Sequence, residues 1–412
     1  MSINPIKKTP SLLGGSMIIA GTAIGAGMFS IPIVTAGVWF NGSVFLLIYT
    51  WACMLISGLM ILEVNLHYSV GASFYRMTKD LLGRIWSCIN GLSIAFVLYI
   101  LIYAYISAGS SIIFDTFSGI FNVSQSAAGM CFSVVVAFIV WLSTRMVDRL
   151  STFLIGAMVI TFILSVGQLF FRVETAILFP QNIEPTQYLP YALISLPYLL
   201  SSFGYHGNVP GLVKYYHKNS DCVVKSLFFG TLIALIIYLI WQYVIQGNIP
   251  RESFKQVITE GGNISSLLKQ IDSFSDTDIT RQLLNAFSYM ALVSSFLGVS
   301  LGLFDYISDF FSFSDDSWGR TKSSLVTFLP PTVAAFFFPD GFLDAIGFAG
   351  LAATLWAVII PALMVRASRL RFKKSVYQVP GGKIMIYFII FFGLINAVSQ
   401  ILSLAGVVPI YQ

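Results

Sequence analysis

The chain has 412 residues, of which 57% are hydrophobic and 10% are charged, and its mean hydropathy is +0.83. Soluble domains carry about 25% charged residues, so this composition excludes a soluble globular protein and predicts one that crosses a membrane several times. The net charge of +5 is explained by the basic loops described below, so it does not indicate a nucleic-acid partner.

Eleven apolar segments are each long enough to cross a bilayer, which takes about 20 residues. They lie near residues 11–38, 43–66, 87–117, 127–144, 151–171, 189–213, 226–246, 282–311, 323–339, 342–365 and 384–405. Lys7 and Lys8 precede the first segment, as in a signal peptide, but the segment is longer than a signal peptide's apolar region of about 7–15 residues. We therefore expect an uncleaved first spanning helix and a single transmembrane domain over residues 1–412.

The basic residues predict the orientation. With a cytoplasmic N-terminus, 18 of the 23 Lys and Arg residues lie in cytoplasmic segments, and the five outside are Arg172, Arg251, Lys255, Lys269 and Arg281. This bias follows the positive-inside rule and predicts a C-terminus on the periplasmic side. The basic run RASRLRFKK (366–374) is predicted to be a stop-transfer anchor, and the alternative is that it binds anionic lipid or an acidic partner.

Glycine-rich interruptions divide the first and sixth segments, reading GTAIGAGMFSIP (21–32) and SFGYHGNVP (202–210). Lipid cannot satisfy the N–H and C=O groups that such breaks release, so they are expected only where they line a protected cavity. The breaks are five helices apart, so the second segment enters the membrane from the opposite side. This pattern predicts an inverted repeat of residues 11–171 and 189–365, with 384–405 as an added helix, and a transporter site at the breaks.

Each break carries groups that suit an amino acid. Free N–H groups at the positive end of a helix dipole, near Gly25 and Gly27, suit a carboxylate. The alternative is that Gly21 and Gly25 form only a packing face between helices. In the second break, the polar groups of Tyr205 and His206 would cost free energy at membrane depth unless they bind a ligand or a proton. His206 could serve substrate or proton, or could instead be a structural hydrogen-bonding group.

Further candidates lie in the second, third and eighth segments. Glu63 is the acidic residue well inside the second segment, and isolated carboxylates at this depth mark proton pathways. It is therefore a proton-coupling candidate, unless donors such as Asn65 make it a capped structural carboxylate. Tyr99 and Tyr103 share one helical face and could stack on an aromatic substrate, although core filling explains most aromatic residues.

The eighth segment contributes small residues and two acidic ones. Ser295 lies in the stretch SSFLGVSLG, which is typical either of close helix packing or of a substrate wall. Asp305 and Asp309 lie one turn apart near the cytoplasmic end. We expect them to pair with basic cytoplasmic residues, and the alternative is an inner gate.

Several stretches of the sequence together resemble those of a known protein family. The stretches GTAIGAGMFSIP, LMILEVNL, LYILIYAYISA, SFGYHGNVP, GNIPRESF, SSFLGVSLGLFDY, FAGLAATLWAVIIPA and GGK resemble the hydroxy/aromatic amino acid permease family, most closely its tryptophan-specific members. The resemblance implies an all-α inner-membrane proton symporter of the amino acid–polyamine superfamily. It also implies eleven transmembrane helices in the LeuT-like 5+5 inverted repeat, with helices 1 and 6 broken and one extra helix.

The resemblance also implies the site. L-tryptophan or a related aromatic amino acid would lie between the two breaks, with helices 3, 8 and 10 around its side chain. The residues implied are Gly21, Thr22, Gly25 and Gly27 on one side and Ser202, Phe203, Gly204, Tyr205 and His206 on the other. Relatives often carry a coupling lysine in helix 5, where this chain has Met158. Coupling is then expected to rest on Glu63 and His206, unless the carrier is not a simple proton symporter.

Other functions fit the sequence less well. A tyrosine carrier is the nearest alternative, since it would differ only in the pocket walls. An intramembrane enzyme would need a catalytic group, and the chain has three histidines but neither HExxH nor GxSxG. The four cysteines show no CxxC spacing, so we expect no disulfide framework, metal or cofactor. An ion channel would need a filter motif, and none is present.

Overall fold

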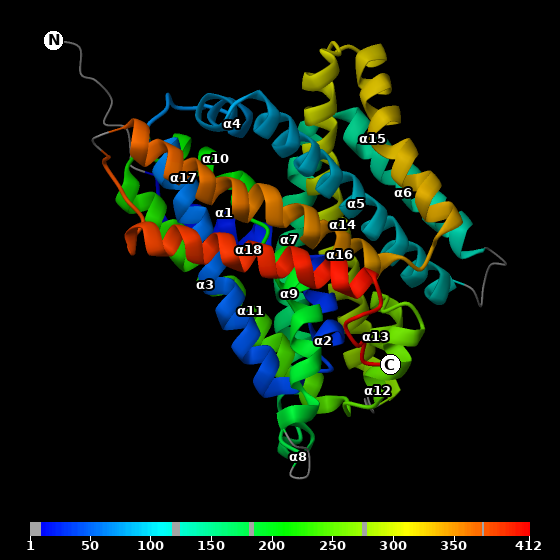
Figure 1. Ribbon diagram of the computed structural model, residues 1–412. Coiled ribbons are helices and arrows are strands. Elements are labelled where there is room, and N and C mark those ends of the chain that lie inside the picture. Colours follow the sequence, from blue (N-terminus) through cyan, green and yellow to red (C-terminus); the bar gives the residue numbers. More distant parts are fainter. Residues whose placement is uncertain (1–9, 118–123, 181–184, 274–277, 373–374) are drawn as a thin grey trace.

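The computed structural model describes residues 10–117, 124–180, 185–273, 278–372 and 375–412, and over these ranges the chain is all-helical (Figure 1). The elements are α1 (Leu12–Ala23), η1 (Ala26–Phe29), α2 (Ser30–Val34), α3 (Trp39–Asn65), α4 (Phe74–Leu82), α5 (Arg84–Phe117), α6 (Gln125–Leu142), α7 (Thr144–Phe170), α8 (Thr175–Leu178), η2 (Pro185–Gln187), η3 (Leu189–Tyr191), α9 (Ala192–Ser202), η4 (His206–Asn208), α10 (Val209–Tyr215), α11 (Ser220–Asn248), α12 (Ser253–Thr259), α13 (Ile264–Ser273), α14 (Asp278–Phe311), α15 (Ser317–Phe337), α16 (Phe342–Ala353), the π-helical η5 (Thr354–Ile359), α17 (Ile360–Arg371) and α18 (Gly382–Leu404).

Every predicted apolar segment is helical. Within the described ranges, eight helical runs are long and apolar enough to cross a membrane: α3, α5, α6, α7, α11, α14, α18 and the continuous run α16–η5–α17. The pair formed by α1 and the η1–α2 segment bends by 53° and makes a ninth if it is counted as one broken span. The sixth and ninth predicted segments form α9–η4–α10 and α15, and neither is among the eight: α9 and α10 are short, and α15 is long enough but not apolar enough.

Short polar side chains begin several of these helices. Each accepts a hydrogen bond from a first-turn N–H that would otherwise lack a partner. The capping residues are Ser11 of α1, Ser73 of α4, Ser124 of α6, Ser143 of α7, Asn219 of α11 and Asp316 of α15. Because Ser143 caps it, α7 begins before the predicted start near residue 151. Its first two turns contain charged residues and precede the apolar part of the helix.

Two helix pairs around the breaks approach closely because of glycine. α1 packs along α11, where a Cβ on Gly230 would lie 2.6 Å from Ile19 Cβ. α16 packs on α9, where a Cβ on Gly350 would lie 2.1 Å from the Pro197 carbonyl oxygen. Small residues at these contacts let the backbones meet, as in other membrane helix bundles. Both broken helices are therefore held tightly by continuous neighbours.

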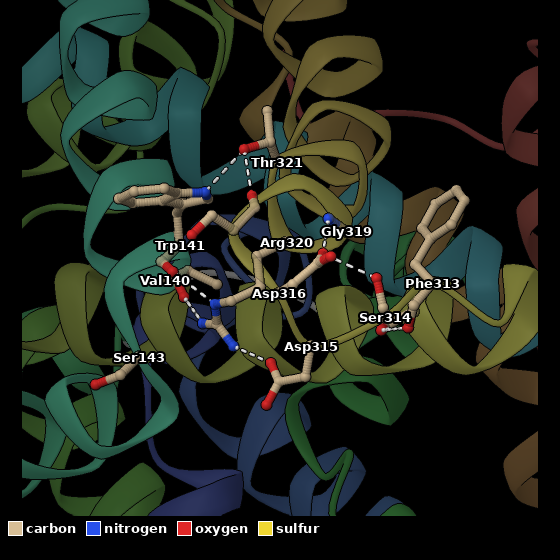
Figure 2. A network of polar contacts seen from close by, with 12 residues as sticks. Val140, Trp141, Ser143, Phe313, Ser314, Asp315, Asp316, Gly319, Arg320 and Thr321 are labelled. Atoms are coloured by element: carbon tan, nitrogen blue, oxygen red, sulfur yellow. Dashed lines mark hydrogen bonds and ion pairs between the residues drawn. The ribbon is translucent and has the colours of Figure 1, made fainter.

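A polar network joins α6 to α15 on the side of the molecule away from the breaks (Figure 2). Arg320 donates to the Val140 and Trp141 carbonyls at the C-terminal end of α6, at 2.8 and 2.7 Å, and to Asp315 at 2.9 Å. The Trp141 indole donates to Thr321 Oγ1 at 3.1 Å. Arg320 thus satisfies carbonyl groups that the end of a helix leaves without partners, and its charge suits the negative helix end.

Candidate functional site

The first break separates α1 from η1 by two extended residues. Ile24 and Gly25 both leave the helix, and Gly25 has φ −172° and ψ −159°. A Cβ on Gly25 would lie 2.3 Å from Ser295 Oγ on α14. The same hydroxyl accepts a hydrogen bond from the Ala26 N–H at 3.2 Å. The structure therefore brings the predicted Ser295 to the predicted break, and only glycine leaves room for this contact.

The second break lies directly beside the first. α9 ends at Ser202, and the chain restarts as η4 at His206. Asn208 Nδ2 donates to Thr22 Oγ1 at 2.5 Å, and the Thr22 hydroxyl donates to the Ile18 carbonyl at 2.7 Å. A Cβ on Gly27 would lie 3.9 Å from Ser202 Oγ. Residues predicted from separate halves of the sequence thus meet in space.

The remaining break residues take up different surroundings. A Cβ on Gly21 would meet nothing within 4 Å, so Gly21 lies beside open space. Phe203 is fully buried, with its ring centroid 5.2 Å from that of Tyr238. A Cβ on Gly204 would lie 3.0 Å from the Ser201 carbonyl oxygen. Space is therefore open beside Gly21 in the first break, while Phe203 and Gly204 in the second break are closely packed.

Tyr238 of α11 contacts both breaks through its hydroxyl group. Its side chain is fully buried, and its hydroxyl lies 2.6 Å from the Ala23 carbonyl oxygen and 2.7 Å from that of Ser202. Those carbonyls end α1 and α9. Sequence reasoning missed Tyr238, although Thr231, Tyr238 and Gln242 form a buried polar stripe at helical spacing on α11. That stripe was the available signal.

His206 is fully buried at the second break. Neither of its ring nitrogens has a hydrogen-bond partner among the described residues. A weaker interaction with the Met54 carbonyl remains, and that carbonyl already accepts from the Tyr205 hydroxyl at 3.0 Å. The imidazole stacks on the Tyr205 ring, with centroids 4.5 Å apart. At least one ring nitrogen of this titratable group is therefore available to a proton or ligand.

The edge of Trp356 faces the His206 ring, with centroids 6.2 Å apart and planes at 85°. Trp356 lies in the π-helical η5, and its indole Nε1 is buried without a partner among the described residues. Such π-helical turns occur often at functional sites. Helix 10 was expected to line the substrate side chain, but Trp356 was not among the predicted residues.

The tyrosines of α5 are placed differently from expectation. The hydroxyls of Tyr99 and Tyr103 donate to the Val326 and Phe338 carbonyls, at 2.9 and 2.8 Å. They therefore face α15 and its end, and the structure does not bring them to the breaks. Tyr105, on another face of α5, is buried and interacts with the Ser295 side chain. It is the α5 tyrosine that reaches the first break.

Glu63 is fully buried, and it is not isolated. Arg369 of α17 binds it through two hydrogen bonds, at 2.6 and 2.8 Å, and the Val379 N–H donates to it at 2.7 Å. Arg369 also donates to the Val379 carbonyl at 3.0 Å. The expected donor Asn65 instead contacts Met77 Sδ at 3.3 Å. Glu63 thus joins α3, α17 and the segment before α18.

The expected pairing of Asp305 and Asp309 with basic residues differs from the structure, whereas the stop-transfer role of the basic run stays a prediction. Asp305 and Asp309 are exposed on α14, and neither forms an ion pair with a described residue, since Arg320 pairs with Asp315. In the basic run 366–374, Arg369 forms a largely buried ion pair with Glu63, and Arg371 forms an exposed ion pair with Asp80 at 2.8 Å. Lys373 and Lys374 lie outside the described residues.

A cleft of about 490 Å³ opens elsewhere in the molecule. It lies between the end of α5, the start of α6 and the α12–α13 region, and Asp115, Asn263 and Asp340 are among its lining residues. No break residue lines it. Among the described residues, no set of His, Cys, Asp and Glu side chains is arranged to hold a metal ion.

These features define an all-helical, multi-pass membrane protein with polar groups gathered where two interrupted helices meet. A family model described as the tryptophan/tyrosine permease family matches residues 8–400, and the chain belongs to that family. Family membership excludes the alternative of an intramembrane enzyme, because the members are permeases.

Similar proteins cover essentially the whole chain. The chain is 54% identical over 403 residues to a tryptophan-specific transport protein of Haemophilus influenzae, with 96% of each chain covered. It is 52% identical over 412 residues to a tryptophan-specific transport protein of Shigella flexneri, with both chains covered in full. It is 42% identical over 413 residues to a tyrosine permease of Enterobacter agglomerans, covering 98% of this chain and 99% of that protein.

Proposed function

We propose that this protein imports tryptophan across the bacterial inner membrane by proton symport. The observation that carries the proposal is the meeting of two helix breaks beside an unpartnered, buried His206. The substrate is favoured by the relatives, since those named for tryptophan-specific transport are 54% and 52% identical and the one named a tyrosine permease is 42% identical. Alternating access would move one group of helices about this central site.

We propose that eleven helices span the membrane as two inverted repeats of five, with α18 added. Helix packing supports this symmetry, because the third helix packs on the tenth (α5 on α16) and the fifth on the eighth (α7 on α14). Two further contacts join corresponding helices: Trp51 to Thr231 and Trp141 to Thr321, both at 3.1 Å and both 180 residues apart in sequence. The 18-to-5 charge bias supports a cytoplasmic N-terminus and a periplasmic C-terminus.

The substrate would lie between the breaks. N–H groups around Gly25 and Gly27 would bind its carboxylate, since both lie where a helix restarts and its dipole is positive. Half-helix carbonyls near Ser202 would accept from its ammonium group. The indole would pack near Tyr105 and Trp356, which are the aromatic side chains of helices 3 and 10 that approach the breaks.

We propose that His206 takes up the coupled proton. It is the titratable side chain at the breaks whose ring nitrogens form no well-aligned hydrogen bond with a described residue, and Met158 of α7 cannot titrate in its place. Glu63 would act second, since protonating its carboxylate would weaken the ion pair with Arg369 and free the segment at Val379. In this scheme the Glu63 ion pair closes the cytoplasmic side, and the proton links that closure to occupancy of the breaks.

The substrate assignment is tested by competition. Uptake of labelled tryptophan into liposomes containing the purified protein is measured against unlabelled tryptophan, tyrosine and phenylalanine. We expect tryptophan to inhibit at the lowest concentration. Stronger inhibition by tyrosine would make this chain a tyrosine carrier, which is the alternative that the Enterobacter agglomerans relative represents.

A further inference from the structure

The two half-helices that precede the breaks end at one point. The last residue of α1 is Ala23 and the last residue of α9 is Ser202, and both carbonyl oxygens lie within 2.7 Å of Tyr238 Oη. The tyrosine comes from α11, which is continuous through this region. Its side chain is fully buried, with the Phe203 ring beside it, so water has no direct access to this point.

The hydrogen-bonding capacity at this point is unbalanced. A tyrosine hydroxyl has one proton, so it can donate to only one of the two carbonyl groups at a time. Both carbonyls also lie at helix C-termini, which each carry roughly half a negative charge. Two negative helix ends therefore face one partial positive charge, in a buried region where electrostatic interactions are strong.

Such an arrangement has the chemistry of a monovalent cation site. Half-helix C-termini and unwound carbonyl groups are the ligands that coordinate sodium in transporters with broken helices. Here the Tyr238 hydroxyl occupies the space that such a cation would need. It supplies a hydrogen-bond donor to the same carbonyl groups without bringing a full charge.

We propose that Tyr238 is a built-in substitute for a coupling cation. It holds the ends of α1 and α9 together without an ion, and it excludes sodium from the transport cycle. The inference rests on the proposed function and adds to it the basis of ion specificity. Tyr238 is a positioning residue in this account, because it acts through the two half-helices and does not itself carry the proton.

The test compares three variants of the purified protein in detergent. Tyr238→Asn removes the ring, opens the space and leaves a carbonyl ligand. Tyr238→Phe removes the hydroxyl but keeps the ring, so no ion fits. Tyr216→Asn is the matched control, because Tyr216 is also buried and its hydroxyl bonds the Ser11 carbonyl at 2.9 Å, but at the N-terminal end of α1 where the dipole is reversed.

Labelled tryptophan binding and melting temperature are measured in sodium chloride and in choline chloride at equal ionic strength. We expect no sodium effect on the wild type, on Tyr238→Phe or on Tyr216→Asn. In Tyr238→Asn we expect sodium to raise tryptophan affinity about tenfold, which corresponds to about 1.4 kcal/mol, and to raise the melting temperature. In Tyr238→Phe we expect about tenfold weaker binding, since buried carbonyl groups lose their donor.

Sodium-stimulated binding by the wild type would overturn the inference. So would a folded Tyr238→Asn protein that ignores sodium, or wild-type tryptophan affinity in Tyr238→Phe. If Tyr238→Asn does not fold, the Phe variant and the wild type still decide, because both predictions are independent of it. Failure of the wild type to bind tryptophan would instead refute the proposed function, and the sodium arms would then be run with whichever aromatic amino acid binds.

Discussion

At the scale of single residues, the proposed site contains two side chains that are buried without hydrogen-bond partners among the described residues. His206 and Trp356 both place ring nitrogens in the interior where no described group satisfies them. A buried polar group without a hydrogen bond costs about 1–3 kcal/mol, so these groups destabilise the protein when no substrate is bound. A bound substrate or proton would supply the missing hydrogen bonds, which is why we propose that the site lies at these two residues.

Replacing His206 separates substrate binding from proton coupling. We expect His206→Gln to lose accumulation driven by a pH gradient, because glutamine can form hydrogen bonds but cannot titrate. Exchange of internal for external tryptophan should continue, since exchange needs no net proton movement. Both are measured in liposomes with the same protein preparation. Accumulation at the wild-type level in this variant would remove His206 from the coupling mechanism.

Gly25 offers a sharper steric test of the first break. An alanine there would place its Cβ 2.3 Å from Ser295 Oγ, so α14 or the break must move. We expect Gly25→Ala to lower tryptophan binding at least about tenfold, a cost of about 1.4 kcal/mol. Gly156→Ala on α7 is the control, because its Cβ would meet nothing within 4 Å. Equal binding by the two variants would argue against a substrate site at this break.

The Asp80 carboxyl on α4 gives a pH dependence outside the membrane. Its pKa is lowered by the hydrogen bond from the Tyr68 hydroxyl at 2.7 Å and then by Arg371. A pKa that is lower when folded stabilises the protein above the unfolded value near 4, and this is lost as the pH falls through the folded value. The effect should stay under about 1 kcal/mol because the pair is exposed.

This is checked by comparing melting temperatures of the wild type and Asp80→Asn between pH 7 and the acid limit of folding. The difference between them should shrink as the pH falls. A difference that grows toward acid would contradict the ionised state that we assign to Asp80.

How far the site could be predicted depends on where each residue's partner lies. Gly25, Thr22 and His206 stand in short stretches whose composition is itself unusual for a membrane helix, so the sequence alone was enough to propose them as site residues. Tyr238 and Tyr105 are ordinary aromatic residues in apolar helices. Their importance depends on partners in other helices, Ala23 and Ser295 among them. Periodicity does not encode those partners.

At the scale of helices, the breaks and the continuous helices around them have different roles. α1 and α9 end at the breaks, while α11 and α14 pass the breaks and supply Tyr238 and Ser295. Hydropathy was enough to predict where helices lie, because each apolar segment must satisfy its backbone internally. It could not predict the π-helical η5, where the Ser57 hydroxyl of α3 donates to the Ala357 carbonyl. That contact depends on packing between helices distant in sequence.

The ion pair between α3 and α17 predicts an asymmetric pair of variants. Glu63→Gln resembles the protonated carboxyl, so we expect accumulation to be lost and exchange to be retained. Arg369→Gln leaves a fully buried carboxylate without its cation, which should cost about 3 kcal/mol of stability and impair both activities. Thermal unfolding and the two transport assays check this. Wild-type accumulation in Glu63→Gln would restrict Glu63 to a structural role.

The junction of α6 and α15 is predicted to be purely structural (Figure 2). Arg320→Met would leave the Val140 and Trp141 carbonyls without their donor, and we expect a loss of about 1–3 kcal/mol. Lys322→Met, on the same helix but over the Phe313 and Trp318 rings, is the control and should change stability less. Tryptophan affinity should be unchanged in both, as measured by binding to the purified proteins. Altered affinity in Arg320→Met would connect this junction to the site.

At the scale of the whole molecule, the proposed inverted repeat explains why the two breaks lie side by side and would form one site. Contacts such as Trp51–Thr231 and Trp141–Thr321 join corresponding helices across the two halves. A site at the meeting of two inverted units can open to either side when one group of helices moves against the other. In the proposed cycle, the ion pair at Glu63 would control closure toward the cytoplasm, and the hydroxyl of Tyr238 would determine which coupling ion is used.

The most direct test of this account is labelled tryptophan uptake into liposomes containing the purified protein. A pH gradient, acidic outside, is imposed with and without sodium, and a protonophore is added at the plateau. We predict that tryptophan accumulates above its external concentration, that sodium changes nothing, and that the protonophore releases the excess. Uptake that only equilibrates, or accumulation that requires sodium and ignores the pH gradient, would contradict the account.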